Sequence, residues 1–100
     1  MATPEVAVKK QVRKILTEAD AYYSCPVTGG YGSSGAPDFL VCWCGHFIGI
    51  ECKSGNAKPT PLQQKNLDDI TAAGGVVFVI RETNVEVLRS FFFPEGVKNV

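Results

Sequence analysis

The sequence predicts an α/β domain whose helices and strands follow the order α-β-β-β-α-β-α. Three observations support this order: an N-terminal segment with helical periodicity, two apolar runs joined by a tight turn at Gly45, and a β-branched run at 76–80 that follows a second helical segment. The 100 residues suit one domain, so we expect a single domain over residues 1–100.

The first helix is expected over residues 3–21, with Thr3 as the N-cap and Pro4 at the first helical position. Its apolar residues recur at helical spacing and form one stripe: Val8, Val12, Ile15, Leu16 and Ala19. A short strand over 21–27 and a loop rich in Gly and Ser over 28–37 follow it.

The central segment predicts a β-hairpin. Two strands, 38–44 and 46–53, flank the turn at Gly45. A second loop, 54–59, leads to a helix over 60–73.

That second helix is expected to stop at Gly74 and Gly75. The run "VVFVI" at 76–80 is uninterrupted by polar residues, which is typical of a strand buried on both faces.

A last helix is expected over 83–93, where Thr83 and Glu86 match a capping box. It carries three consecutive phenylalanines at 91–93, and a short helix cannot direct all three toward one core. They either form a partner surface or complete a small core.

Composition excludes several classes of protein. The formal net charge is zero, so nothing global indicates nucleic acid. One residue separates Cys42 from Cys44, fewer than the two to four that usually separate zinc ligands. Buried thiols are therefore favoured over zinc for these two and for Cys25 and Cys52. A structural zinc protein is the alternative.

No apolar run is long enough to span a membrane, and the N-terminus carries charges where a signal peptide needs apolar residues. We therefore expect a cytoplasmic protein in a reducing compartment.

Polar residues interrupt the hairpin at one end. Strand alternation places Glu51 and Lys53 on the same face, about 7 Å apart. Asp38 starts the preceding strand, and antiparallel pairing brings it opposite the end of the next one. Asp38 and Glu51 can then converge on a cation such as Mg²⁺, with Lys53 near its phosphate ligand or water. The alternative is an exposed charged cluster that contributes little.

Two further polar residues lie on inward helical faces. Glu5 falls on the stripe of the first helix, although a first-turn glutamate is also favoured by the helix dipole. Gln63 faces inward in the second helix, although it also forms a capping box with Thr60. Both side chains are candidates for the same site.

The string Pro37-Asp38 followed by Glu51-Cys52-Lys53 spells PD…ExK and resembles the PD-(D/E)XK nuclease superfamily. With "GSSGAPDFL", the short gap, the helix-one glutamate and "TPLQQ", nearly the whole chain resembles the VRR-NUC family, in its stand-alone phage and bacterial form. The resemblance implies a restriction-endonuclease-like αβββαβ core, a central mixed sheet flanked by helices, plus a C-terminal helix.

The resemblance also implies residue roles. Asp38, Glu51 and the main-chain carbonyl of Cys52 would ligate Mg²⁺, for which Mn²⁺ would substitute. Lys53 would orient or activate the water. Gln63, or Gln64 in the neighbouring register, would support the site, and Glu5 would act through metal-bound water or a second ion.

Stand-alone relatives of this kind resemble homodimers that cut four-way DNA junctions, in a bacterial or phage-infected cell. Candidate contacts to the DNA backbone are Lys9, Lys10, Arg13, Lys14, Lys58 and Lys65. The basic run of the first helix is alternatively a solvated face. A non-catalytic DNA-binding module, a flap nuclease and an RNA substrate remain alternatives.

Overall fold

The computed structural model describes residues 3–27 and 35–94, which form one four-stranded mixed sheet with three helices. Its elements are α1 (Pro4–Glu18), β1 (Tyr22–Ser24), β2 (Phe39–Trp43), β3 (His46–Cys52), α2 (Pro61–Ala72), β4 (Val76–Ile80) and α3 (Val85–Phe92). The strands lie in the order β1-β2-β3-β4; the first three are antiparallel and β4 is parallel to β3. The predicted α/β class and element order are confirmed.

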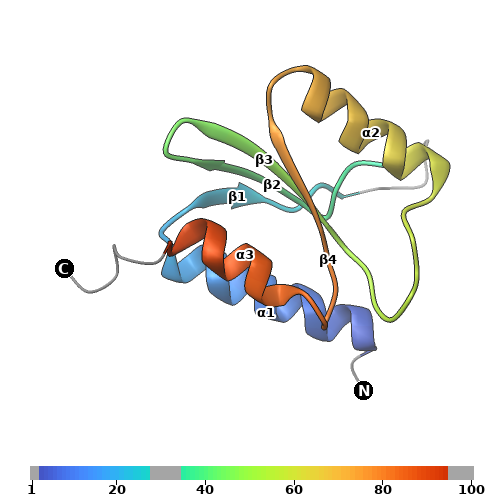
Figure 1. Ribbon diagram of the computed structural model, residues 1–100, viewed down its shortest axis with the longest axis horizontal. Helices are drawn as coiled ribbons and strands as arrows, with labels where there is room; N and C mark the ends of the chain where they lie inside the picture. Colours follow the sequence, from blue (N-terminus) through green and yellow to red (C-terminus); the bar gives the residue numbers. More distant parts are fainter. Residues whose placement is uncertain (1–2, 28–34, 95–100) are drawn as a thin grey trace.

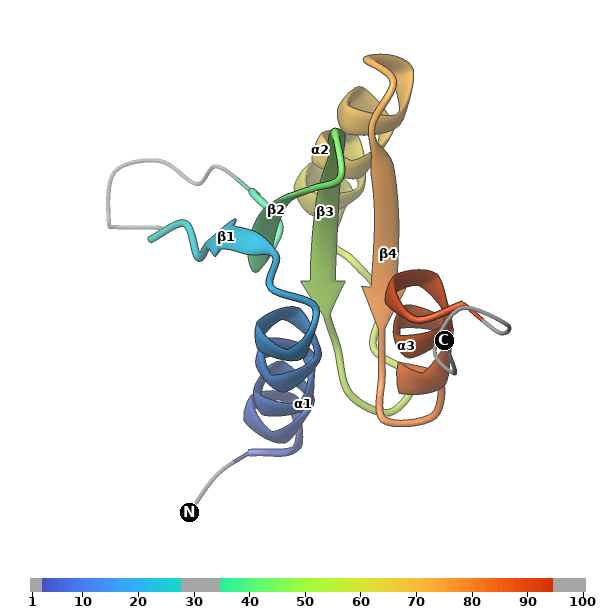
Figure 2. The ribbon, with the colours of Figure 1, turned by 90° about the vertical axis from the view of Figure 1, so that its left-hand side faces the viewer.

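The helices cover both faces of the sheet. Figure 1 shows α1 and α3 side by side below the strands and α2 above them, and Figure 2 shows the same pair of helices from the side. A parallel β3–β4 pair needs a crossover connection, and α2 supplies it.

The hairpin between β2 and β3 turns over two residues, Cys44 and Gly45, whose φ angles are 50° and 81°. Positive φ at both positions is the geometry of the tight turns that match strand twist. The register then follows, because the turn pairs Trp43 with His46 and, four steps on, Phe39 with Ile50. The predicted tight turn is confirmed.

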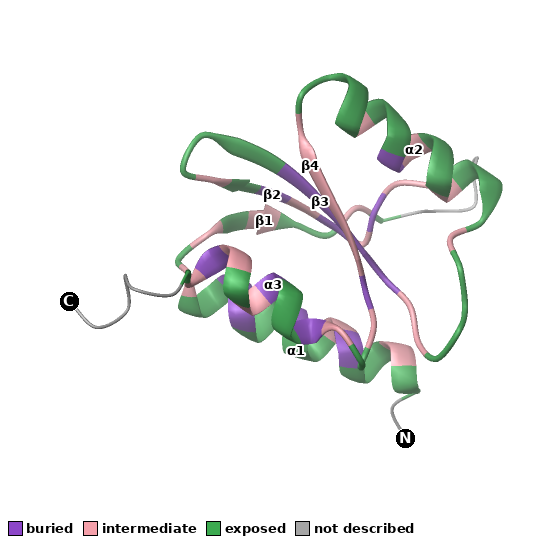
Figure 3. Ribbon diagram, in the orientation of Figure 1, coloured by how far each residue is buried: buried purple, intermediate pink, exposed green. Residues whose placement is uncertain are grey.

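The core lies between the sheet and the α1/α3 pair, as the purple segments of Figure 3 indicate. Its members come from both helices and three strands: Val8, Val12, Ile15, Leu16, Phe39, Val41, Ile48, Ile50, Cys52, Ile80, Val85, Leu88 and Phe92. The predicted stripe of the first helix is confirmed. Ile48, Ile50 and Cys52 share one face of β3, which leaves Glu51 facing the α2 side.

The prediction that residues 76–80 are buried on both faces is wrong. In the part of the chain that the structure describes, β4 pairs with β3 alone and forms an edge of the sheet. Its first four residues are half-buried and only Ile80 is buried. An unbroken apolar run does not distinguish a central strand from an edge strand that a helix partly covers.

The prediction of buried cysteines is wrong for three of the four. Cys25, Cys42 and Cys44 are exposed and only Cys52 is buried. β1 ends at Ser24, before the predicted strand reaches Cys25, and Cys44 lies in the turn.

The predicted capping box of Thr83 and Glu86 does not form. The last helix begins at Val85, and its N-cap is Asn84. The side chain of Asn84 is used differently: its Oδ1 accepts from the Arg81 amide at 2.6 Å, and its Nδ2 donates to the Val79 carbonyl at 3.0 Å. Asn84 therefore fastens the turn between β4 and α3.

The three phenylalanines at 91–93 complete the core rather than expose a patch. Phe92 is 4% exposed, and Phe91 and Phe93 are partly buried against the core. The ring of Trp43 lies 4.8 Å from that of Phe92 and 5.6 Å from that of Phe91. These aromatics therefore give no support to a partner surface.

The Gly- and Ser-rich loop predicted at 28–37 lies largely outside the described residues, which resume at position 35. None of the described helices combines the length and the apolar character that crossing a bilayer requires.

The two hydrogen bonds of Asn84 predict a local difference in stability. Asn84→Ala should lower the free energy of unfolding by about 1–2 kcal/mol, because a half-buried donor and acceptor lose their partner. Thr83→Ala, the variant that a capping box would make costly, should change it by less than about 0.5 kcal/mol. Urea unfolding of both variants checks this, and equal losses would contradict the arrangement.

Candidate active site

Asp38 is fixed at the start of β2, next to the end of β3. Pro37 before it is buried, and the first ladder pair after it joins Phe39 to Ile50. The amide of Cys52 donates to Asp38 Oδ2 at 2.8 Å. One carboxylate oxygen is therefore held by the backbone of the neighbouring strand, as the antiparallel register predicts.

Glu51 is the one buried charged residue among those the structure describes, with 2% of its surface exposed. Its Oε2 lies 3.5 Å from Lys53 Nζ. Burial, followed by repulsion from Asp38, raises the pKa of Glu51 to about 7, although Lys53 acts in the opposite direction and Glu5 adds further repulsion. The positive charge of Lys53 is therefore too small to offset the burial of this carboxyl and the negative charges around it.

Lys53 directly follows Cys52, the last residue of β3. Its amide donates to the carbonyl of Ile80 at 3.0 Å, which extends the pairing with β4. Its side chain is 12% exposed and reaches Glu51 on the same face, as strand alternation predicts. A partly buried ammonium at the sheet's end is suited to contact an anion.

Cys52 lies between the two motif residues with its thiol on the core face. Burial, followed by the negative charges of Asp38 and Glu51, raises the pKa of this thiol far above its ordinary value. The thiol therefore stays protonated, and the main-chain carbonyl is the group of Cys52 that suits a hard cation.

The first two turns of α1 bring a third acid, Glu5, and a lysine, Lys9, to the same place. Lys9 Nζ lies 3.4 Å from Asp38 Oδ1 and 3.8 Å from Glu5 Oε2. Glu5 is half-buried, and its charge also acts on Glu51. Three carboxylates and two lysines therefore lie within electrostatic reach of one another.

The glutamines of α2 have other partners. Gln63 forms the capping box with Thr60: its Oε1 accepts from the Thr60 amide at 2.9 Å, and its own amide donates to Thr60 Oγ1 at 3.2 Å. Gln64 Nε2 donates to Asp68 at 3.0 Å. The capping alternative for Gln63 is therefore confirmed, and these bonds do not join either glutamine to Asp38 or Glu51.

The basic residues proposed for DNA fall into different environments. Five are exposed: Lys10, Arg13, Lys14, Lys58 and Lys65. The guanidinium of Arg13 lies 5.5 Å from the ring centre of Phe39, and Lys65 pairs with Asp69 at 2.8 Å. Lys9 differs from all of them because its ammonium lies between the carboxylates of Glu5 and Asp38.

The loop between Lys53 and α2 is fastened by two side chains that sequence reasoning missed. Arg81 Nη2 donates to the carbonyl of Ala57 at 2.7 Å, and the amide of Gly55 donates to Glu82 at 2.8 Å. Both partners come from the turn after β4, so only the folded chain brings them together.

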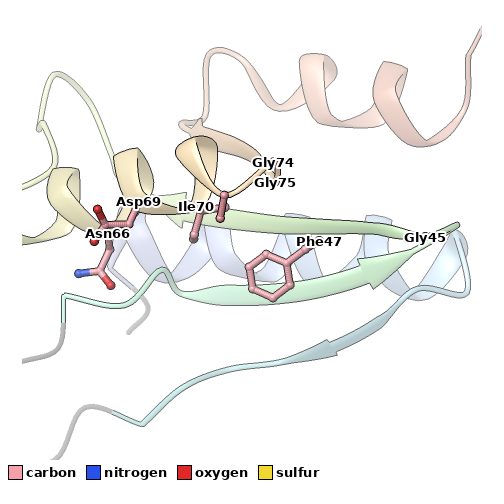
Figure 4. A pocket seen from close by; sticks show the side chains of 8 residues that line it. Gly45, Phe47, Asn66, Asp69, Ile70, Gly74 and Gly75 are labelled. Carbon is pink, nitrogen blue, oxygen red and sulfur yellow. The ribbon is translucent and has the colours of Figure 1, made fainter.

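A separate hollow of about 480 Å³ lies between the hairpin turn and the C-terminal half of α2. Figure 4 shows Asn66 and Asp69 toward one end of it, Gly45 toward the other, and Phe47, Ile70, Gly74 and Gly75 between them. Phe47 and Glu51 share a face of β3 but are four residues apart, roughly 13 Å, so this hollow is distinct from the acidic group.

The cluster of Asp38, Glu51 and Glu5 can hold only a cation that takes several of its ligands from water or from the substrate. The described residues contain no set of three or more His, Cys, Asp or Glu side chains placed to hold a metal. Asp38 and Glu51 with the carbonyl of Cys52 offer oxygen ligands alone, and Mg²⁺ commonly binds through one or two carboxylates and keeps several waters. The raised pKa of Glu51 fits, because a nearby cation would favour its charged form.

Comparison with models of known protein families and with curated proteins found no match.

The buried Glu51 carboxyl predicts a pH-dependent stability in protein kept free of metal. Its folded pKa of about 7 exceeds the ordinary 4.5, so folding binds a proton between these values and stability is lost as pH rises through them. The loss should reach up to about 3 kcal/mol. Urea unfolding in chelator at about pH 5 and about pH 8 measures it.

Glu51→Gln should abolish that part of the pH dependence, whereas Glu86→Gln, at an exposed carboxyl, should keep it. A pH dependence in Glu51→Gln equal to that of the wild type would show that Glu51 ionises normally in the folded protein.

Proposed function

We propose that this protein is a divalent-metal-dependent DNA endonuclease that hydrolyses phosphodiester bonds in branched DNA, with four-way junctions as its main substrate. The observation that carries the proposal is the meeting of Asp38 and buried Glu51 at one end of the β2–β3 hairpin, with Lys53 3.5 Å from Glu51. The resemblance to VRR-NUC proteins supports it, and the proposed fold is accordingly restriction-endonuclease-like.

Each residue has a proposed task. Asp38, Glu51 and the Cys52 carbonyl hold Mg²⁺ or Mn²⁺, which supplies a polarised phosphate oxygen and a more acidic water. The Cys52 amide keeps the Asp38 carboxylate oriented. Lys53 places positive charge where the phosphate gains negative charge, and it orients the attacking water.

Glu5 and Gln63 have supporting tasks in this proposal. Glu5 acts through a water on the metal or through a second ion. Gln63, or its neighbour Gln64, would need to extend toward the site from the start of α2, where Gln63 is also the capping partner of Thr60.

DNA contacts come from exposed basic residues on α1 and around α2, namely Lys10, Arg13, Lys14, Lys58 and Lys65. Such residues bind phosphates, so they position the substrate without reading its sequence. Recognition by shape and a dependence on salt follow from this mode of binding. The proposed location is the cytoplasm.

Cleavage of a labelled four-way junction with Mg²⁺ tests the function. Asp38→Asn, Glu51→Gln and Lys53→Ala should each lower the rate by at least about 100-fold, because each removes a charge at the reacting centre. Glu86→Gln, which alters an exposed carboxylate of α3, should cut at the wild-type rate.

Flaps, forks, duplexes and the matching RNA belong in the same assay, because each identifies a different substrate class. Binding of the junction with no metal-dependent cutting of any substrate would reject the enzyme and favour a DNA-binding module.

We also propose that the protein acts as a homodimer, because two sites related by a two-fold axis match the symmetry of a four-way junction. Light scattering should give a mass twice that of one chain at the concentrations where junctions are cut. A chain that cuts junctions as a monomer would overturn the dimer, and a monomer that cuts flaps instead would favour the flap-nuclease alternative.

A further inference from the structure

Lys9 is separated by the fold from the other basic residues of its helix. Val8 and Val12 are buried, so this side of α1 faces the sheet, and the Lys9 side chain, 33% exposed, extends along it toward β2. Lys10 and Lys14 are exposed instead. Its position therefore differs from that of a lysine reserved for the DNA backbone.

Both carboxylate oxygens of Asp38 have a partner, and Lys9 is one of the two. The Cys52 amide takes Oδ2 at 2.8 Å, and Lys9 Nζ lies 3.4 Å from Oδ1. Oδ1 is the oxygen that the Cys52 amide does not hold, and the ammonium of Lys9 lies beside it. Lys9 also lies 3.8 Å from Glu5, which holds it in place from its own helix.

The charge of Lys9 is secure at neutral pH. Partial burial lowers the pKa of Lys9, but the charge and hydrogen bond of Asp38, together with Glu5, outweigh burial and raise it. A full positive charge thus neutralises Asp38, as Lys53 partly neutralises Glu51. A divalent cation entering between these carboxylates meets both ammonium groups.

We propose that Lys9 competes with the divalent metal for Asp38: its ammonium lies beside Oδ1 of Asp38 in the metal-free protein and must move away from that oxygen when the metal binds. The inference rests on the proposed function. It adds that a lysine outside the PD…ExK motif lowers the affinity of the site for the metal. At low metal concentration this lysine therefore keeps the metal from binding.

Metal binding without DNA tests the competition directly. Isothermal titration calorimetry with Mn²⁺ should show that Lys9→Met binds about ten-fold more tightly than the wild type, because a positive charge at contact distance from a ligand is gone. Arg89→Met removes a positive charge that pairs with Glu18 at the C-terminal end of α1, and it should bind like the wild type. Lys9→Arg keeps the charge and should also remain within about two-fold of the wild type.

A second readout accompanies the first. The Mn²⁺ concentration that gives half-maximal cleavage of a four-way junction should fall in Lys9→Met by the same factor as the dissociation constant. Circular dichroism and urea unfolding establish that each variant is folded, and Lys9→Gln replaces Lys9→Met if the latter is not.

The outcomes separate this inference from the function on which it rests. Wild-type protein that binds Mn²⁺ and cuts DNA, with Lys9→Met binding no more tightly than Arg89→Met, would overturn the role of Lys9 and leave the nuclease intact. Wild-type protein that neither binds Mn²⁺ nor cuts DNA would overturn both.

Discussion

The hydrogen bond from the Cys52 amide to Asp38 Oδ2 is the contact on which the candidate site depends. It joins Asp38, directly before β2, to the last residue of β3, and so ties the start of one strand to the end of its neighbour. It also fixes the direction in which the second oxygen of Asp38 points. Glu51 and Lys53 lie on either side of Cys52 in the chain, and the same strand end therefore positions all three charged groups.

A buried carboxylate at that strand end has a cost that the surrounding residues only partly offset. Burial and the charge of Asp38 raise the pKa of Glu51 to about 7, and Lys53 at 3.5 Å does not cancel them. Evolution of a purely structural core would favour an apolar residue at this position, since buried ion pairs rarely add stability over apolar packing. The arrangement is better explained by a function that requires negative charge there, and strained electrostatics of this kind are common at catalytic sites.

Two lysines each neutralise a different carboxylate of the site. Lys53 follows Glu51 on β3, whereas Lys9 approaches Asp38 from α1, and the two carboxylates are thus each matched by an ammonium from a different element. The core explains how α1 reaches this place: Val8 and Val12 pack against the same sheet face as Ile50 and Cys52. Packing of an apolar stripe therefore sets the position of a polar contact at the edge of that stripe.

Local sequence patterns determined much of this protein. Helical periodicity placed α1 and α2, alternation put Glu51 and Lys53 on one face, and the short hairpin brought Asp38 to them, because each of these depends on neighbours along the chain. Tertiary structure alone decided that β4 is an edge strand, that Asn84 rather than Thr83 fastens the start of α3, and that Lys9 joins Asp38 instead of the exposed basic face. These depend on which segments, distant in sequence, meet in space, and no periodicity within one segment carries that information.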